Sequence, residues 1–315
     1  LTKRLPAAEA LAELKAYLME VGADWLATKL LTGLMKEELP LTLSRRLKGK
    51  FIFPPLPNQM FMRDSSSWIQ EGVWLGKMAK PERQPESLHL EVVYRFHPRF
   101  VQARPPLRQE ENEIPSHLGL EGGDILVLSD SALIFAMSER TSLKLIETLC
   151  ARLFAAARIE QALIVQLPFE RRFMHLDTVL TMVDQGRFCV FPSLLEETLP
   201  LYLLTPDEKN KPRLEKLPDL KIALKKLLKT NSLDFILTGG ADWAEIQAEQ
   251  WNESNNLLAV KPGMVLAYEK NIATNRKLQA AGIEVIPLPS SALRRGRGGP
   301  HCLSCPLQRL PFFPA

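Results

Sequence analysis

Long apolar stretches are the first thing that this sequence lacks. No run comes near the roughly 18 consecutive apolar residues that a membrane-spanning helix needs, although 46% of the 315 residues are hydrophobic. The N-terminal region has the pattern of an amphipathic helix and not the apolar block of a signal peptide. We therefore expect a cytoplasmic protein with no membrane partner, and a chain long enough to bury a sizeable core.

A strong excess of one charge is also missing. The chain has 40 Lys and Arg against 36 Asp and Glu, a formal net charge of +4, and the basic residues are scattered among acidic ones. Nucleic-acid-binding domains concentrate basic residues on one face, so no nucleic-acid partner is expected. Lys221, Lys225 and Lys229 recur every four residues opposite a row of leucines, which is typical of the solvated face of a helix.

Signatures of cofactor and metal sites are scarce. No G-x-G-x-x-G motif follows a predicted strand, which excludes a common dinucleotide-binding loop. The single C-x-x-C, Cys302 and Cys305, lacks the second pair that a structural zinc site usually requires. We therefore expect neither a cofactor nor a metal, with a redox-active dithiol as an alternative for this pair. Cys150 and Cys189 lie in apolar patterns typical of core residues.

The chain changes texture near residue 51. Before it, Leu11, Leu14 and Leu18 follow the three-four spacing of a buried helix face. After it, prolines at positions 54, 55 and 57 break the helical pattern. This contrast predicts a helical subdomain at residues 1–50 and an α/β domain at residues 51–315.

Within the second domain, a unit of strand, turn, strand, helix and strand recurs. The period is irregular, so the architecture repeats and the sequence does not. Such ββαβ units suggest an α/β fold whose blades surround an axis. The three clearest copies span residues 124–166, 179–237 and 257–287, and a weaker copy spans residues 61–95.

A glycine-rich, doubly basic run, Arg295 to Cys302, ends in a cysteine. Glycine permits tight turns and close approach of the backbone to a ligand. Nearby arginines favour the thiolate, which is the nucleophilic form of cysteine. Cys302 is therefore a candidate for covalent catalysis, and the alternative is an incidental cysteine in a C-terminal loop.

Polar side chains recur directly before the repeated units. Asp64, Glu121, His175 and Asp177 all lie at these points. If the units form a ring, these side chains meet Cys302 at one end of the axis. Taken singly, each has an ordinary alternative: a turn, a salt bridge, the start of a strand or, for His175 and Asp177, a pair of metal ligands.

The chain resembles bacterial arginine deiminase from about residue 50 to its end. The segments that carry the resemblance are Pro57-Asn58-Gln59-Met60-Phe61-Met62-Arg63-Asp64-Ser65-Ser66, Glu121-Gly122-Gly123-Asp124, Glu139-Arg140-Thr141-Ser142, Met174-His175-Leu176-Asp177-Thr178-Val179 and Arg295 through Pro306. They occur in the order of that family and close to its spacing.

The resemblance implies a pentein-type, five-bladed α/β propeller that hydrolyses L-arginine to L-citrulline and ammonia without metal or cofactor. It assigns residues 1–50 to a helical insertion. Asp64 and Asp177 are expected to grip the guanidinium, and Arg83 and Arg140 to hold the substrate carboxylate. The resemblance further places Phe61 beside the substrate and Arg297 close to Cys302.

The expected reaction begins with attack of Cys302 on the guanidinium carbon. His175 then donates a proton so that ammonia leaves a thiouronium intermediate, and afterwards acts as base for water. Glu121 orients protonated His175, as a carboxylate does in related triads. Hydrolysis of agmatine or methylarginine is an alternative, although the pair Arg83 and Arg140 argues against agmatine, which has no carboxylate.

One departure from the family concerns completeness. The chain starts at Leu1, without an initiator methionine and apparently without the first blade, so four of the five units are visible. We expect a fragment, an open ring, or a ring completed by another chain. Exposed sheet edges invite association, so a homo-oligomer, dimer or tetramer, is expected, and an inactive arginine-binding protein is a further alternative. Met62 replaces a small polar residue of the family, with little expected effect.

Overall fold

The computed structural model describes residues 8–100, 118–196 and 199–309. The chain divides into two compact units, residues 1–60 and residues 61–315. The boundary predicted at residue 50 falls inside the first unit, because a strand that follows it pairs back onto this unit. Every residue predicted for the functional site lies in the second unit.

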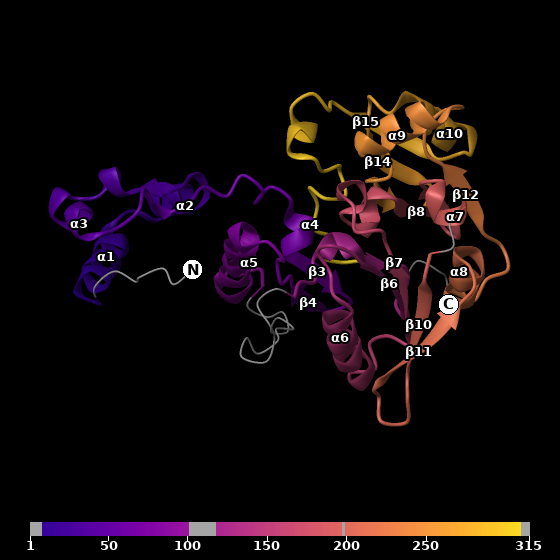
Figure 1. The fold of residues 1–315 in the computed structure, drawn as a ribbon, viewed down its shortest axis with the longest axis horizontal. Helices are drawn as coiled ribbons and strands as arrows, with labels where there is room; N and C mark the ends of the chain where they lie inside the picture. Colours follow the sequence, from indigo (N-terminus) through magenta and orange to yellow (C-terminus); the bar gives the residue numbers. More distant parts are fainter. Residues whose placement is uncertain (1–7, 101–117, 197–198, 310–315) are drawn as a thin grey trace. The chain divides into compact units, whose positions relative to one another are not determined.

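The first unit is small and mainly helical (Figure 1). Its elements are α1 (Ala8–Glu20), α2 (Ala23–Thr32), β1 (Leu34–Met35), η1 (Lys36–Glu38), α3 (Leu41–Arg46) and β2 (Phe51–Phe53). The antiparallel pair β1–β2 joins the segment after α3 to the helices. Gly33 connects α2 to β1 with φ +91°, and a β-carbon there would lie 3.0 Å from the Pro55 nitrogen, so only glycine fits this turn without strain.

The buried face of α1 differs from the prediction. Leu14 is buried, but Leu11 is 50% exposed, and Ala10 takes the buried position one turn before Leu14. Residues four apart share a helix face, and Ala10 and Leu14 pack with Leu34 and Leu43. The apolar spacing indicated a helix correctly, but a small alanine and not a leucine provides the close contact.

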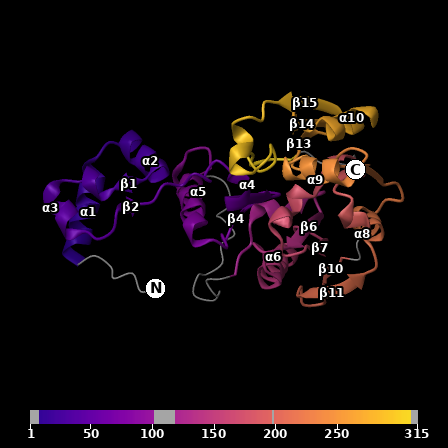
Figure 2. The ribbon, with the colours of Figure 1, turned by 45° about the horizontal axis from the view of Figure 1, so that its top comes forward.

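The second unit contains the repeated ββαβ architecture, and this confirms the predicted fold class. Three of its sheets share one pattern, in which the first two strands are antiparallel and a helix leads to a third strand parallel to the second. The connection between parallel strands therefore crosses over through a helix, as such strands require. The helices α5, α6, α8 and α10 lie at the outside of this unit and the strands lie inward (Figures 1 and 2).

The elements of the second unit follow the chain as four blades. The first has α4 (Met62–Ser65), β3 (Ser66–Ile69), β4 (Gly72–Leu75), η2 (Pro81–Arg83) and α5 (Gln84–Phe96). The second has η4 (Gly122–Asp124), β5 (Ile125–Val127), β6 (Ala132–Met137), α6 (Leu143–Ala155) and β7 (Gln161–Gln166). The third has η5 (Arg171–Phe173), η6 (Leu176–Thr178), β8 (Leu180–Asp184), β9 (Arg187–Val190), α7 (Ser193–Glu196), α8 (Leu220–Leu228), β12 (Asp234–Leu237) and α9 (Trp243–Trp251). The fourth has β13 (Leu258–Lys261), β14 (Met264–Tyr268), α10 (Ile272–Ala280), β15 (Glu284–Leu288) and η7 (Leu293–Gly296).

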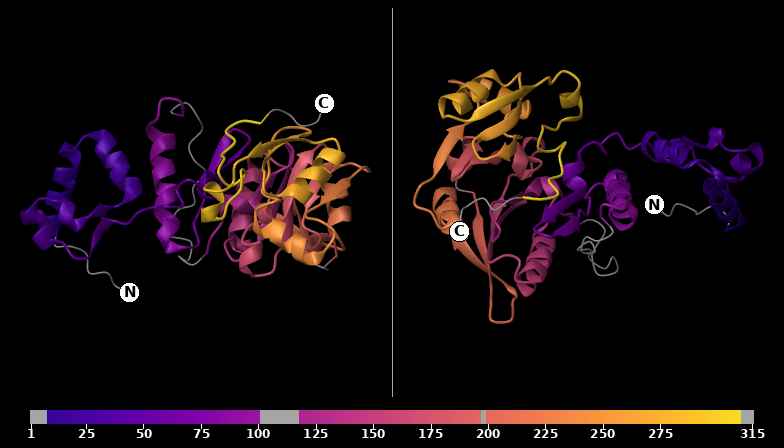
Figure 3. Two further views of the ribbon diagram at one scale, coloured as in Figure 1. Left: turned by 90° about the horizontal axis from the view of Figure 1, so that it is seen from above. Right: turned by 180° about the vertical axis from the view of Figure 1, so that it is seen from behind.

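A hairpin that the sequence analysis did not predict extends the second blade. Strands β10 (Leu201–Pro206) and β11 (Pro212–Leu217) are antiparallel, and β10 pairs with β7. The turn of this hairpin projects away from the rest of the unit (Figures 1 and 3). The five-stranded sheet ends at β11, whose central residues are exposed and include basic and acidic side chains. Exposed charges commonly protect an edge strand against further pairing.

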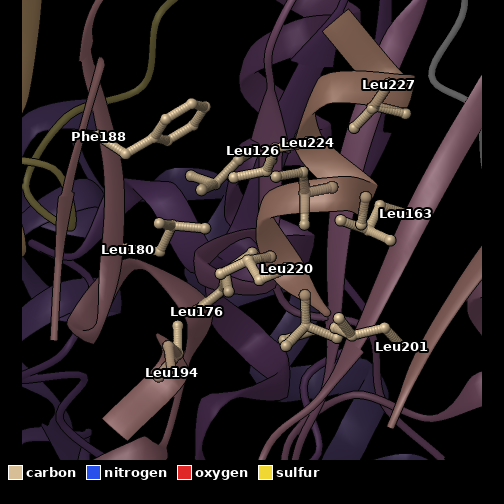
Figure 4. Close-up of a cluster of buried hydrophobic side chains, with 14 of the residues drawn as sticks. Leu126, Leu163, Leu176, Leu180, Phe188, Leu194, Leu201, Leu220, Leu224 and Leu227 are labelled. Carbon is tan, nitrogen blue, oxygen red and sulfur yellow. The ribbon is translucent and has the colours of Figure 1, made fainter. Parts of the chain in front are cut away.

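The largest apolar cluster lies between the second and third blades. Leucines of α8 at positions 220, 224 and 227 face Leu163 and Leu201 of the five-stranded sheet and β8–β9 residues of the next blade (Figure 4). Of the lysines predicted to face solvent, Lys221 on α8 and Lys229 at its end are exposed, and Lys225 is half-buried. Cys150 and Cys189 are fully buried in neighbouring clusters, which confirms their structural role.

Short segments before the first strand of each blade adjoin one another. We call these the lead segments: α4, the residues 119–124 with η4, the residues 174–178 with η6, and residues 253–257. Helix α4 contacts η4, and η4 contacts η6. The predicted convergence of polar side chains therefore takes place within this unit. None of the helices in the described ranges is both long and apolar enough to cross a membrane.

Candidate active site

The lead segments carry a group of buried polar side chains. Asp64 is 3% exposed, His175 is 1% exposed, and Glu121 and Asp177 are completely buried. Cys302, which follows the last strand, is 5% exposed. The structure thus brings all five predicted catalytic residues into one buried region. Since a buried charge is costly unless it is paired, their mutual contacts decide their chemistry.

Two glycines allow the lead segments to approach so closely. A β-carbon at Gly122 would lie 1.9 Å from the Arg63 carbonyl oxygen, and one at Gly123 would lie 2.7 Å from the His175 ring. Both distances are far below van der Waals contact. The Glu-Gly-Gly-Asp motif therefore has a steric role, since its glycines leave room for the backbone of α4 and for the imidazole.

His175 lies between two carboxylates. Its Nε2 is 2.9 Å from Glu121 Oε2, and its Nδ1 is 3.5 Å from Asp64 Oδ1. Glu121 is itself fixed, because its Oε1 accepts a hydrogen bond of 2.9 Å from the Ala79 backbone N–H. The Glu121 carboxylate thus fixes the orientation of the His175 imidazole. This is the contact that was expected between these two residues.

The carboxylates hold a proton on His175. Burial alone would lower the pKa of His175, but the charge of Asp64 and the hydrogen bond to Glu121 outweigh burial and raise that pKa to about 10. Burial acts to raise the pKa of Glu121, but the hydrogen bond and positive charge of His175 lower it below its usual range. Near neutral pH the pair is an imidazolium and a carboxylate, so His175 is a proton donor.

Asp177 connects His301 to Cys302. Its Oδ2 is 2.8 Å from His301 Nδ1 and accepts a hydrogen bond of 3.4 Å from Cys302 Sγ. Burial, followed by the positive charge of Arg63, lowers the pKa of His301 to about 4. The neutral imidazole therefore donates its Nδ1–H to Asp177. The sequence analysis did not single out His301, although it directly precedes the cysteine.

The Cys302 sulfur is protonated in this environment. Burial raises the pKa of its thiol well above the usual range, and the charges of Asp177, Asp64 and Glu253 raise it further. Arg63 does interact with Cys302, but burial and the carboxylates outweigh the effect that was expected of nearby arginines. The Arg297 guanidinium stacks on the Trp251 ring, 3.4 Å from its centre, and among the described residues it forms no hydrogen bond with Cys302.

Asn256 is a neighbour of Cys302 that the sequence analysis missed. Its Nδ2 donates to Cys302 Sγ at 3.0 Å, and its Oδ1 accepts from the Cys302 backbone N–H at 2.9 Å. A signal was present, because Asn256 lies directly before the predicted unit at 257–287, where the other units carry their acids.

Two carboxylate oxygens keep unused capacity to accept hydrogen bonds. Asp64 Oδ1 and Asp177 Oδ1 are buried, and neither accepts a hydrogen bond from the residues that the structure describes. A buried acceptor without a donor is unfavourable. The pair is suited to a cationic ligand with several N–H groups, and Cys302 Sγ lies beside one of its members.

Arg83, expected to hold the substrate carboxylate, pairs with two buried carboxylates of the protein. Its guanidinium forms a hydrogen bond of 2.9 Å to Asp64 Oδ2 and a two-pronged contact with Glu86 at 3.0 and 2.8 Å. Burial lowers the pKa of Arg83, but the Asp64 charge and the Glu86 hydrogen bonds raise it overall. Arg83 therefore binds one of the acids expected to grip the substrate.

Arg140 retains a buried donor without a hydrogen-bond partner. Its Nε is 3.1 Å from Glu139 and its Nη2 is 3.2 Å from Met174 Sδ. Nη1 is 3.5 Å from Glu121 Oε2 and makes no hydrogen bond within the described part of the chain. This guanidinium can therefore donate a hydrogen bond to an anionic group of a ligand.

Phe61 and the glycine-rich run lie against each other. Phe61 is 4% exposed. A β-carbon at Gly296 would come within 2.8 Å of its ring, and one at Gly298 within 2.3 Å. The glycines of Arg295–Cys302 therefore let the backbone cover an aromatic ring, a role that does not follow from their number alone.

Arg63 and Asp124 fix the backbone of the site. Arg63 donates its backbone N–H to the Cys302 carbonyl at 3.1 Å and its Nε–H to the His301 carbonyl at 3.2 Å. Asp124 accepts 2.7 Å and 3.0 Å hydrogen bonds from the Ser138 hydroxyl and the Leu176 backbone N–H. Both residues stood in the quoted motifs, but only contacts in three dimensions show what they hold.

One group of side chains has the spacing of a metal site. Ligand atoms of Asp64, Glu121 and His175 lie within 4.8 Å of one another. A protonated imidazole has two N–H donors and no lone pair for a metal, and the raised pKa of His175 keeps it in this form. The geometry is better explained as a network of hydrogen bonds and ion pairs.

The C-x-x-C pair is not a disulfide, since all four cysteines are free. The Cys305 sulfur lies 3.5 Å from the Ser66 hydroxyl and 3.8 Å from the Tyr94 hydroxyl. It takes part in the packing of the first blade, where Arg63 donates a 3.0 Å hydrogen bond to Ser304 on the same turn.

Comparison with known proteins identifies relatives of the whole chain. A family model described as arginine deiminase matches residues 3–309. A variant of the N-terminal domain of ArgZ, covalently bonded to a reaction intermediate, has a TM-score of 0.57 at 18% identity over 82% of this chain and 78% of that chain. Dimethylarginine dimethylaminohydrolase, as an adduct with 4-chloro-2-hydroxymethylpyridine, has a TM-score of 0.53 at 19% identity over 80% and 81%.

A further similar structure is longer than this chain. Full-length ArgZ, an arginine dihydrolase from the ornithine-ammonia cycle in cyanobacteria, has a TM-score of 0.56 at 17% identity over 82% of this chain but only 34% of its own length. The chain therefore spans about a third of that protein. At these identities the structural similarity concerns the fold.

Proposed function

This chain belongs to the arginine deiminase family, and on that premise we propose that it hydrolyses L-arginine to L-citrulline and ammonia through a covalent adduct on Cys302. The family makes it a hydrolase of guanidino groups with a pentein fold. The choice of arginine and the roles of the individual residues are our proposal.

The observation that supports it most is the pair of unused acceptors at Asp64 Oδ1 and Asp177 Oδ1. A guanidinium is planar and cationic, and it has five N–H donors in a fork. Carboxylates bind that fork with charge-assisted hydrogen bonds. A guanidinium held by both acids has its central carbon near Cys302 Sγ, which already contacts Asp177 at 3.4 Å, so attack becomes effectively unimolecular.

The substrate also activates the nucleophile. The thiol is protonated because burial and the negative charges of Asp177 and Asp64 disfavour the thiolate. A cationic guanidinium bound between these acids offsets their charge and favours deprotonation of Cys302. The reactive thiolate therefore forms mainly when the substrate is present.

The chemistry then proceeds in two halves. The thiolate forms a bond to the guanidinium carbon, His175 donates its proton to a terminal nitrogen, and the carbon–nitrogen bond breaks to release ammonia. Neutral His175 next takes a proton from water, and the hydroxide adds to the same carbon. The added hydroxyl then gives up its proton to solvent as the carbon–sulfur bond breaks, which forms the C=O of citrulline, releases the product and restores the thiolate.

Binding of the substrate carboxylate requires a rearrangement of Arg83. Arg83 uses Asp64 Oδ2 as a partner, and a substrate guanidinium competes for the same carboxylate. The substrate guanidinium then takes the place of the Arg83 guanidinium at Asp64. Arg83 becomes available, together with Arg140 Nη1, to bind the substrate α-carboxylate. If Arg83 stays with Asp64 and Glu86, a substrate without a carboxylate, such as agmatine, is the second candidate.

The test is an incubation with L-arginine that measures citrulline and ammonia, run in parallel with agmatine and methylarginine. We expect arginine to be the preferred substrate and Cys302→Ala to show no turnover. Faster hydrolysis of agmatine would support the second candidate. Calorimetric binding of arginine without citrulline formation would instead identify an arginine-binding protein.

A further inference from the structure

The fourth lead segment differs from the other three in the side chain that it directs into the site. The first three supply the carboxylates Asp64, Glu121 and Asp177. The fourth also holds a buried acid, Glu253, but the side chain that it directs at the Cys302 sulfur is the amide of Asn256. Asn256 is completely buried. Its neighbour in the site is a sulfur that must carry negative charge, and not a cation.

Both ends of the Asn256 side chain contact the same residue. The amide N–H donates to Cys302 Sγ at 3.0 Å, and the amide oxygen accepts from the Cys302 backbone N–H at 2.9 Å. The Asn256 carbonyl also accepts a hydrogen bond of 3.3 Å from the His301 N–H. Gly299 permits this contact, since a β-carbon there would lie 2.6 Å from Asn256.

The two hydrogen bonds of the sulfur have opposite directions. Cys302 Sγ donates to Asp177 Oδ2 and accepts from Asn256 Nδ2. When the thiol loses its proton, the contact with Asp177 changes from a hydrogen bond to a repulsion. The bond from Asn256 becomes a charge-assisted one and gains strength.

On the premise of the proposed function, we propose that Asn256 is the positioning residue of the nucleophile, which aims the Cys302 sulfur through its backbone N–H and donates a hydrogen bond to the sulfur as it becomes an anion. A carboxylate at this position would repel the anion, and an apolar side chain would leave it without a donor. This accounts for an amide, and not a further acid, at the position of the fourth segment that contacts the sulfur.

Other charged or titratable groups also act on Cys302 and set the background for a test. Burial and three carboxylates raise the pKa of Cys302, and the Asn256 hydrogen bond lowers it. These groups come from three lead segments, strand β14 and the cysteine's own turn: Asp64, Arg63, Asp177, Glu253, Tyr268 and His301. A substitution of Asn256 alone leaves all of them in place.

The experiment measures the rate at which iodoacetamide alkylates Cys302 between pH 7 and 10, read by peptide mass mapping to separate it from Cys305. For Asn256→Ala we expect labelling about 10-fold slower than wild type at a given pH, because loss of one hydrogen bond to an anion raises the pKa by about one pH unit. Asn256→Asp keeps an acceptor for the Cys302 backbone N–H but adds a negative charge beside the sulfur. We expect Cys302 in this variant to be labelled more slowly still.

Asn255→Ala is the matched control. Asn255 is equally buried, but its side chain contacts Thr238 and Cys189 and not Cys302. Destabilisation opens the site and speeds labelling, so a slower rate at Asn256 cannot come from partial unfolding. Labelling of Asn256→Ala at the wild-type or control rate would overturn the proposal.

Turnover of L-arginine adds a separate measurement. Because Asn256 contacts the nucleophile, Asn256→Ala should lower kcat about 10-fold or more with little change in KM, and a rise in KM alone would contradict the inference. If the wild type does not hydrolyse arginine, the proposed function fails, but the alkylation rates still decide the role of Asn256.

Discussion

At the scale of single residues, the site depends on buried groups that set one another's protonation. Asp64 and Glu121 together raise the pKa of His175 to about 10, against the effect of burial. Burial, together with the charges of Asp177 and Asp64, also raises the pKa of Cys302 and so keeps its thiol protonated. In the proposed mechanism, carboxylates therefore keep the proton on the general acid, His175, and also keep the Cys302 thiol protonated until a cationic substrate binds.

Replacement of Glu121 by Gln tests the first of these effects. Gln removes a charge that raises the His175 pKa, so the imidazolium loses its proton at a lower pH. Activity requires that proton and falls as pH rises through the pKa, so the alkaline limb of the kcat profile should move to lower pH. We also expect kcat near neutral pH to fall by about 10²-fold. An alkaline limb unchanged in Glu121→Gln would contradict this role.

Replacement of Asp177 by Asn should change two measurements in opposite directions. Loss of the charge lowers the Cys302 pKa, so alkylation by iodoacetamide at pH 8 should become about 10-fold faster. Loss of a guanidinium acceptor should lower kcat/KM for L-arginine by about 10²- to 10³-fold. A circular-dichroism melting curve serves as the folding control. If both rates fall together with stability, Asp177 is a structural residue.

At the scale of elements, the ββαβ units were predictable because their apolar runs have the length and period of buried strands. The units predicted at residues 124–166, 179–237 and 257–287 each contain two strands, a helix and a third strand in that order. The β10–β11 hairpin was not predicted, since its outer strand is mostly polar and exposed. The side-chain orientations of Arg83 and Arg297 could not be predicted either. Glu86 is close to Arg83 in the sequence, but the other partners, Asp64 of Arg83 and Trp251 of Arg297, are distant.

The glycines of the second lead segment give a prediction about close packing. Gly123→Ala places a methyl group against the His175 ring and 2.9 Å from Asp64 Oδ1. We expect a loss of about 1–3 kcal/mol in unfolding free energy and at least a 10-fold loss of kcat. Gly22→Ala is the control, because its methyl group meets nothing within 4 Å. Equal activity of the two variants would refute the steric role of Gly123.

Helix α8 gives a prediction about the core. Leu224 is fully buried between the second and third blades, whereas Ile222 on the same helix is 48% exposed. Leu224→Ala should lower the free energy of unfolding in urea by about 2–5 kcal/mol. Ile222→Ala should change it by less than about 1 kcal/mol. Similar losses in both variants would show that α8 does not pack as described.

At the scale of the whole molecule, function arises from convergence and not from any one blade. Asp64, Glu121 and Asp177 come from three lead segments, Asn256 from a fourth, and Cys302 from the turn after the last strand. Each is separated from the next by a complete supersecondary unit. The resemblance in sequence located four of these five residues. The fifth, Asn256, was recognised only from its contacts with Cys302 in the structure.

The same arrangement links substrate charge to catalysis. Without a cation, the acids around Cys302 favour the thiol, and Arg83 pairs with Asp64. A guanidinium in the site offsets the acids, competes with Arg83 and faces the sulfur. Formation of the nucleophile and capture of the substrate are therefore two consequences of one binding event.

The most direct measurement is a rapid-quench reaction with L-arginine labelled at the guanidino carbon, followed by peptide mapping. The account predicts a transient label on the peptide that contains Cys302, citrulline as the final labelled product, and neither species with Cys302→Ala. Label on a different residue, or citrulline formed at the wild-type rate by Cys302→Ala, would contradict attack by this sulfur on a guanidinium held between Asp64 and Asp177.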